Sequence, residues 1–232
     1  MLLTGCERQS VVSAEPPQSA SPIRTRLLTD KQYVNTITQV FGADISESVL
    51  PPIPPMERTD GLLASGAAFV GVTSDQISQI QLAAATVAQK VVDEEHRDFL
   101  IPCSPESAIA ADPVCAGLFL AETGRLLLRG SMDETRLAQL VDVASYAAEQ
   151  TEDFYDGLAL ALEAILISPE FVFIVDSVEP DPERPAQQRL DSYSLASRLS
   201  FFLWNAAPDD ALLQAAENGE LHTPQGLARA VD

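Results

Sequence analysis

Apolar side chains recur at helical spacing along most of the chain, and a capping signal precedes each run. After Thr29, the residues Tyr33, Ile37 and Phe41 share one helical face, and Gly42 follows the last of them. A threonine followed three residues later by glutamine forms a capping box, and glycine commonly ends a helix. This pattern predicts a first short helix between Thr29 and Gly42.

Further helices are expected from the same kind of signal. The box at Thr73 opens a longer helix with Ile77, Ile80 and Val87 on one face. The segment GLALALEAIL, in a helix expected from about Thr151, is apolar on most sides and should be central. The other helices are expected to begin at Asp112, at a capping box on Ser131, and at Asp191, Pro208 and Thr223. The predicted class is all-α, a multi-helical bundle with proline-rich loops and no substantial sheet.

Composition divides the chain into four segments. Residues 1–25 form a Ser/Pro-rich tether, 26–176 a helical domain, 177–189 a linker, and 190–232 a second helical module that looks truncated. Within the first domain, the run Pro51-Pro52-Ile53-Pro54-Pro55 forbids helix and is expected to cross the surface. The alternative for this run is a ligand for a proline-binding groove.

The charge balance excludes one class of partner. The chain has 14 Lys and Arg against 34 Asp and Glu, a net charge of −20. Such a surface repels the phosphates of nucleic acid, so nucleic-acid binding is not expected. An acidic face would suit a basic protein partner.

The sequence starts with MLLTGC, which has the form of a bacterial lipobox before Cys6. A lipidated Cys6 would carry at least two acyl chains, enough for stable membrane anchoring. Glu7 stands where an aspartate would signal inner-membrane retention, so the outer membrane is the expected location. The basic start and apolar stretch of a signal peptide do not precede the box. The alternative is a free cysteine in a disordered tail.

The two other cysteines agree with export. Cys103 and Cys115 flank a short loop and, with Cys6 lipidated, would form one disulfide in an oxidising compartment. Two free thiols or a metal pair are the alternatives. A metal site would need further ligands, and the chain has only His96 and His222, both expected to be exposed bystanders. No metal and no cofactor are therefore expected.

Catalytic motifs are absent from the sequence. It contains no haem-attachment motif, no glycine-rich phosphate loop and no nucleophile elbow. Carboxylate catalysis would need a pair such as Asp209 with Asp210, or Glu163 with Glu170, and a pKa raised by burial. Asp209 and Asp210 are explained equally well by the first turn of a helix.

Aromatic residues gather in the helix after Asp191. Tyr193, Phe201, Phe202 and Trp204 follow helical spacing, which favours a place in the core. An exposed set could instead stack on a sugar ring or a haem edge. Arg198, on the same helix, is expected to pair with Asp191 or an acidic loop. The candidate interaction residues are Tyr193, Arg198, Trp204, Asp209 and Asp210.

Four stretches resemble successive pieces of one modular family of exported bacterial proteins, first named from planctomycetes. They are RLLTDKQYVNTITQVFG, CAGLFLAETGRLLLRG, GLALALEAILISPEFVFIVD and RLDSYSLASRLSFFLWNAAPDDALLQAAENGEL. The last resembles the module DUF1592, and its most specific part is Leu190 to Leu213. The resemblance implies a multi-helical lipoprotein whose relatives carry c-type cytochrome modules, and it implies no known activity. Arg125 and Arg129 match an arginine-rich family segment, but the proline that usually ends that segment is missing here.

Two functions remain open from the sequence. The first is a non-catalytic, surface-anchored scaffold or interaction module of an exported assembly, associated with c-type cytochromes. The alternative is an accessory or hydrolytic domain that acts on extracellular polysaccharide. An exposed aromatic cluster beside a carboxylate-lined cleft would favour the polysaccharide, and a buried cluster would favour the scaffold.

Overall fold

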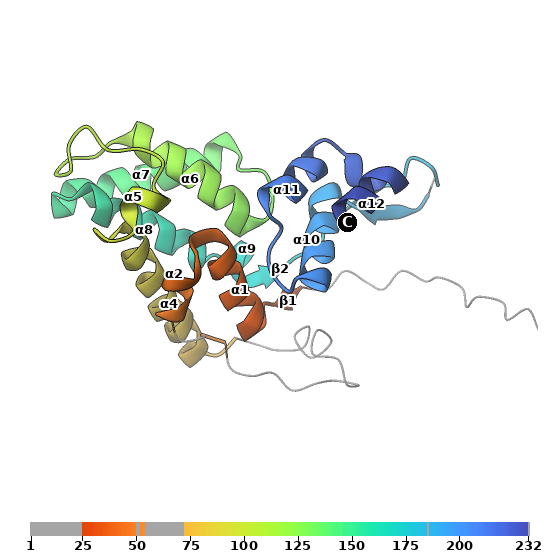
Figure 1. Ribbon diagram of the computed structural model, residues 1–232, viewed down its shortest axis with the longest axis horizontal. Helices are drawn as coiled ribbons and strands as arrows, with labels where there is room; N and C mark the ends of the chain where they lie inside the picture. The colour runs from red at the N-terminus through yellow and green to blue at the C-terminus, as the bar shows by residue number, and fades with distance from the viewer. Residues whose placement is uncertain (1–24, 50–51, 54–71, 185, 232) are drawn as a thin grey trace, which may run out of the picture.

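The computed structural model describes residues 25–49, 52–53, 72–184 and 186–231 of the chain, and they form a multi-helical bundle (Figure 1). This confirms the predicted all-α class. Cys6 and most of the proline run 51–55 lie outside the described residues, although Ile53 is buried in the core. The helices are α1 (Asp30–Phe41), α2 (Ala43–Glu47), α4 (Ser74–Val92), α5 (Arg97–Leu100), α6 (Pro113–Leu128), α7 (Glu134–Thr151), α8 (Phe154–Leu166), α9 (Pro169–Val172), α10 (Ser192–Leu203), α11 (Asp210–Glu217), the 3-10 turn η1 (Glu220–His222) and α12 (Pro224–Val231).

Extended structure is confined to two short antiparallel pairs among the described residues. The strand β1 (Arg26–Leu27) pairs with β2 (Phe173–Ile174), and β3 (Val178–Pro180) pairs with β4 (Gln188–Leu190). The second pair is a hairpin that spans the segment 177–189, expected to be a linker, and ends one residue beyond it. Its proline-rich composition gave no strand signal, because the hairpin is defined by pairing across the turn rather than by apolar alternation.

The helix α8 lies at the centre of the bundle, as expected from its apolar sequence. It packs against α4, α6 and α7, and its side chains Leu158, Leu162 and Ile165 are fully buried. Gly157 lies so close to α7 that an added Cβ would be 2.3 Å from the backbone oxygen of Ala144. The absence of a side chain there lets the two helices approach closely.

Most helix starts agree with the capping signals, and two differ. The capping boxes at Thr29 and Thr73 are both formed. The box predicted at Ser131 is wrong, because the carboxylate of Asp133 caps α7 by accepting from the Arg136 amide at 2.8 Å. The helix expected from about Thr151 begins after Asp153, since Thr151 still belongs to α7.

The aromatic residues predicted to lie in the core near α10 are only partly buried, because Phe201 belongs to the core and serines occupy other inner positions of the helix. Ser194, Ser197 and Ser200 are buried, while Phe202 is 84% exposed and Trp204 is 53% exposed. Two of these three hydroxyls have partners: that of Ser194 accepts from the amide of Ser177 at 2.8 Å, and that of Ser200 donates to the carbonyl of Ser197 at 3.1 Å. Because these polar groups are satisfied, small serines can replace large apolar side chains in the contact. Ile77 of α4, also predicted to face inward, is exposed.

The described residues contain one large and one small apolar core. The large core spans the bundle, and the small one consists of Ala196, Leu212, Ala216 and Leu221. Phe201 and Ala207, which follow the hairpin, belong to the large core. The C-terminal helices are therefore packed onto the bundle. Among the described helices, none is long and apolar enough to cross a membrane.

Candidate functional sites

A buried arginine lies where α6 ends. Arg129 has a left-handed backbone (φ 59°), and its guanidinium donates to the carbonyls of Leu127 (3.2 Å), Phe171 (3.1 Å) and Phe173 (2.8 Å). It also donates to the carbonyl of Glu170. Burial lowers the pKa of Arg129 to about 10, so the side chain remains charged at neutral pH. Arg129 thus fixes α9 and β2 against the end of α6.

Two arginines extend this junction to the C-terminal helices. The guanidinium of Arg129 lies 5.8 Å from the ring centre of Phe201 on α10. Arg125, one turn earlier on α6, pairs with Asp210 and lies 3.8 Å from a carboxylate oxygen of Glu217, both on α11. From the sequence, the two arginines were only matches to a family segment. Their structural role depends on partners far away in the chain.

Arg198 forms an ion pair, but not with Asp191. Its Nη2 lies 2.7 Å from Oδ2 of Asp176, whose side chain is buried just after β2. Asp191 instead caps α10 by accepting from the amide of Ser194 at 2.6 Å. The expected structural ion pair therefore forms with the second of the two expected partners, the acidic loop that starts at Asp176, and it fastens α10 to the end of β2.

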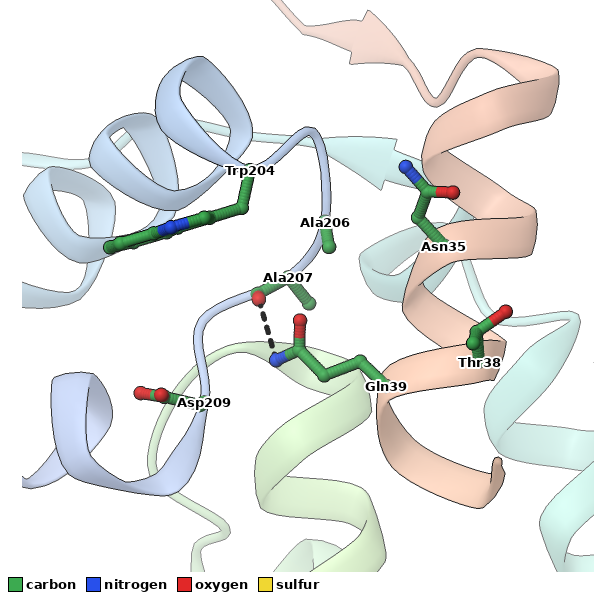
Figure 2. Close-up of a pocket in the computed structure, with 7 residues that line it drawn as sticks. All are labelled: Asn35, Thr38, Gln39, Trp204, Ala206, Ala207 and Asp209. Atoms are coloured by element: carbon green, nitrogen blue, oxygen red, sulfur yellow. Dashed lines mark hydrogen bonds between the residues drawn. The ribbon is translucent and has the colours of Figure 1, made fainter. Parts of the chain in front are cut away.

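A pocket of about 390 Å³ lies between α1 and the turn that joins α10 to α11. Figure 2 shows that this pocket brings Trp204 and Asp209 together with polar side chains of α1. The turn is tied to α1 by Asn35, which donates to the carbonyl of Asn205 at 3.1 Å, and by Gln39, which donates to that of Ala207 at 2.9 Å. Trp204 and Asp209 had been candidates from the sequence, whereas the α1 residues had not.

The remaining interaction candidates lie elsewhere. Tyr193 packs against the small core, and burial raises the pKa of its hydroxyl. Arg198 and Asp210 are engaged in the ion pairs with Asp176 and Arg125. The aromatic cluster expected in the core is thus divided, because only Phe201 of the set is buried.

Two of the candidate carboxylates, those of Asp209 and Glu170, form structural contacts. Asp209 caps α11 by accepting from the amide of Leu212 at 2.8 Å. Arg136 donates to Glu170 at 3.0 Å and holds the pKa of that carboxyl below its ordinary value. A general acid needs a raised pKa. The geometry of Glu170 therefore gives it a structural role.

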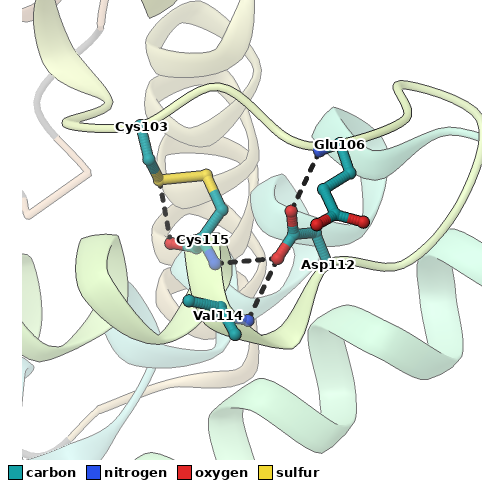
Figure 3. Close-up of a disulfide and its surroundings, with 5 residues drawn as sticks. All are labelled: Cys103, Glu106, Asp112, Val114 and Cys115. Atoms are coloured by element: carbon teal, nitrogen blue, oxygen red, sulfur yellow. Dashed lines mark hydrogen bonds between the residues drawn. A yellow bond between two sulfur atoms is a disulfide. The ribbon is translucent and has the colours of Figure 1, made fainter.

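The disulfide expected from the sequence is formed. Cys103 and Cys115 are joined, and the bridge ties the loop before α6 to the first turn of that helix (Figure 3). The carboxylate of Asp112 accepts from the amides of Cys115 (2.9 Å), Glu106 (3.0 Å) and Val114 (3.1 Å). These bonds, led by that of Cys115, hold the pKa of the Asp112 carboxyl below its ordinary value.

Both histidines are more covered than expected. The side chain of His96 is 15% exposed, and its Nδ1 lies 2.6 Å from Oδ1 of Asp93. The side chain of His222 is 14% exposed, and its Nε2 lies 3.5 Å from Oε1 of Glu179. Within the described residues, no group of three or more His, Cys, Asp or Glu side chains is arranged to hold a metal ion.

One end of the bundle is strongly acidic. It contains the link from α4 to α5, the disulfide-closed loop and the turn from α7 to α8 (Figure 1). Residues 93–98 have four acidic side chains and one arginine, and residues 149–156 have four acidic and no basic ones. Arg97 joins the two stretches by lying 4.3 Å from the ring centre of Tyr155. We call this surface the acidic end; its exposed acids are Glu94, Glu95, Asp98, Glu106, Glu149, Glu152 and Asp156.

Comparison with known families assigns two parts of the chain. Residues 115–176 match PSD5, described as a protein of unknown function (DUF1595), and residues 190–232 match PSD4, described as a protein of unknown function (DUF1592). No curated protein and no solved structure matches the chain. The arginines 125 and 129 lie in the first matched region, and their partners on α10 and α11 lie in the second. Two successive regions of the chain are therefore similar to modules of unknown function, DUF1595 followed by DUF1592.

Proposed function

We propose that this chain is a non-catalytic binding module of an exported bacterial assembly, and that its acidic end docks a basic protein. The observation that supports this most directly is the composition of that end. The two acidic stretches meet where Arg97 lies over the ring of Tyr155, and Phe99, two residues after Arg97, is 88% exposed. An exposed apolar residue within an acidic stretch adds contact area when a partner of opposite charge docks.

The partner we propose is a c-type cytochrome with a lysine-rich face. Positive charge on the partner would be attracted over several ångströms by the net charge of −20, which accelerates the encounter at low salt. The apolar Phe99 would then supply contact area once the surfaces meet. Lys90 and Arg97 are the basic residues nearest this surface, and they lie 3.6 Å and 3.8 Å from the carboxylates of Asp93 and Glu94. Their charge is thus largely offset.

A scaffold role fits the way the two modules are joined. The ion pairs of Arg125 with α11 and of Arg198 with Asp176, together with the buried Arg129, hold the C-terminal helices against the bundle. Such a joint would keep the acidic end and the pocket at Trp204 at a fixed separation.

We propose further that Cys6 carries a lipid anchor and that the protein is attached to the outer membrane. The mass of the protein isolated from its native membrane tests this: a chain that starts at a diacylated Cys6 is expected, and one that retains an unmodified Cys6 would contradict it.

Binding to a basic c-type cytochrome can be tested with neutralised variants. In the triple variant Glu149→Gln, Glu152→Gln, Asp156→Asn, we expect affinity at low salt to fall about tenfold relative to the unchanged chain. The matched control removes the same number of charges far from that surface, through Asp75→Asn, Glu134→Gln and Glu183→Gln. We expect the control to lose less than about twofold. Calorimetric titration at low and at physiological ionic strength measures both.

Two results would overturn the docking proposal. One is an equal loss of affinity in both triple variants, which would show that only net charge matters. The other is the absence of saturable binding by the unchanged chain at low salt.

The polysaccharide alternative has one observation in its favour. Phe202 and Trp204 are exposed, and Trp204 lines a pocket together with a carboxylate. Of the described residues that line the pocket, only Asp209 has a carboxylate, which favours binding of a saccharide over its hydrolysis, because hydrolysis needs two acids.

A further inference from the structure

We propose that the pocket between α1 and the turn from α10 to α11 binds a neutral saccharide, with one sugar ring stacked on Trp204. This goes beyond the docking of a basic protein, because it uses another part of the molecule and another chemistry. The volume of about 390 Å³ falls within the range of about 300–1,000 Å³ typical of ligand pockets.

The pocket wall is fixed before any ligand arrives. Asn35 and Gln39 donate to the carbonyls of Asn205 and Ala207, and the amide of Ala207 donates to the hydroxyl of Thr36 at 3.2 Å. Asn205 has a left-handed backbone (φ 55°), which sharpens the turn. A wall tied by three side chains of α1 loses little conformational entropy on binding.

Trp204 provides an apolar platform. Its side chain is 53% exposed although tryptophan is usually well covered in folded proteins. In Figure 2 the indole is seen edge-on above Ala207 and Asp209, so one of its faces is turned toward the pocket. Sugar rings present flat apolar faces of C–H groups, and stacking on an indole removes both surfaces from water.

The polar side chains of the pocket leave acceptors free. Asn35 and Gln39 use their amide nitrogens in the wall, and among the described residues nothing donates to their side-chain oxygens. Asp209 uses Oδ1 for the amide of Leu212, and no bond within the described chain occupies Oδ2. Sugar hydroxyls are donors that match such acceptors.

The lining also argues against charged ligands. Among the described residues, the lining contains no Lys, Arg or His, so none of its side chains there would offset the charge of a phosphate or carboxylate. A cationic amine would gain from Trp204 and Asp209, but the carboxylate is already shared with the start of α11, and the other polar groups are neutral. A neutral, hydroxyl-rich ligand matches the set best.

Trp204 is the single tryptophan of the chain, so its fluorescence reports on this pocket directly. We would titrate the full chain with cellohexaose, mannohexaose and chitohexaose, and with choline as a cationic probe. The proposal expects a saturable change in intensity and a blue shift with at least one oligosaccharide, and no saturable change with choline.

Variants then locate the site by calorimetry. Trp204→Ala should weaken oligosaccharide binding about tenfold or more. Phe202→Ala, two residues away and 84% exposed but outside the pocket lining, is the matched control and should change affinity less than about twofold. Asp209→Asn keeps a good helix cap while removing the charge, so its effect on affinity is separated from helix stability.

Three results would overturn the proposal: no saturable response to any of the oligosaccharides, a saturable response to choline alone, or an equal loss in Trp204→Ala and Phe202→Ala. None of these bears on the docking of a basic protein, because cytochrome binding by Trp204→Ala should equal that of the unchanged chain. The two proposals can therefore fail separately.

Discussion

The helices α8 and α10 start in the same way and are used differently. Each is capped by an aspartate, Asp153 or Asp191, and each has large apolar side chains along its length. In α8 most of those side chains are buried. In α10 the serines and Phe201 are buried, while Phe202, and Trp204 just after the helix, are exposed. The comparison teaches that helical spacing of apolar residues identifies a helix, but does not by itself identify its inner face.

The reason for the difference lies in the neighbours of each helix. α8 is surrounded by three long helices, so most of its circumference must be apolar. α10 contacts α11 and η1 through small residues such as Ala196, and its buried serines find hydrogen-bond partners. Large side chains near its C-terminal end, such as Phe202, are therefore exposed. This is the physical basis for assigning stability to α8 and binding to the end of α10.

The largest effect is expected where the two regions are joined. Arg129→Met removes the donors to four carbonyls, in two buried and two partly buried hydrogen bonds, so we expect the free energy of unfolding to fall by about 3–5 kcal/mol. Arg136→Met is the matched control, because Arg136 contacts the exposed carboxylate of Glu170, and it should cost less than about 1 kcal/mol. Urea unfolding measures both. Equal losses would mean that burial of Arg129 does not matter.

The difference in burial between α8 and α10 can be tested by truncating one side chain on each helix. Leu162→Ala should lower the free energy of unfolding by about 2–5 kcal/mol, because it opens a cavity in the core. Phe202→Ala should change it by no more than about 0.5 kcal/mol, since that ring is in water. A loss above about 2 kcal/mol in Phe202→Ala would show that α10 is packed as its sequence pattern predicts.

The disulfide should contribute to the free energy of unfolding by an amount comparable to the lower estimate for Arg129→Met. Its sequence separation is 12, and closing such a loop contributes about 3 kcal/mol in the chain-entropy account. Reduction of the unchanged chain should lower the urea midpoint accordingly. The double variant Cys103→Ser, Cys115→Ser should start at the lower midpoint and show no response to reductant. If reductant still lowered the urea midpoint of the double variant, the loss of stability on reduction would not come from this disulfide.

The smallest effect concerns the ion pair of Glu170 with Arg136. The pKa of Glu170 is lower in the folded chain than in the unfolded one, so its stabilisation is complete above the unfolded pKa of about 4.3 and is lost as the pH falls through the folded pKa. Glu170→Gln should therefore cost less than about 1 kcal/mol at pH 7. Urea unfolding should show this difference shrinking below about pH 4. A difference that grows in acid would contradict the direction of the pKa change.

Local signals in the sequence determined much of the fold, and long-range contacts determined the rest. Thr29, Thr73 and Asp112 were recognised as caps because a cap and its helix are neighbours in the chain. The bonds of Arg129 to residues 170–173 link positions about 40 residues apart and left no mark in the local pattern.

The pocket was only half predictable for the same reason. Trp204 and Asp209 stood out by residue type. Gln39, which also lines the pocket, donates to the carbonyl of Ala207, a residue 168 positions later in the sequence. The spacing of Asn35 and Gln39, one turn apart on a face of α1 without large apolar residues, was the signal that could have indicated a polar wall.

The division between a buried α8 and an outward-facing end of α10 is tested most directly by acrylamide quenching of the native protein. Trp204 is the sole tryptophan, so the fluorescence comes from this one position. The account predicts efficient quenching, close to that of the urea-unfolded chain, and an emission maximum typical of a hydrated indole. Weak quenching with a blue-shifted maximum in the native, ligand-free protein would show that Trp204 is buried and would contradict both the assignment of α10 and the pocket built on it.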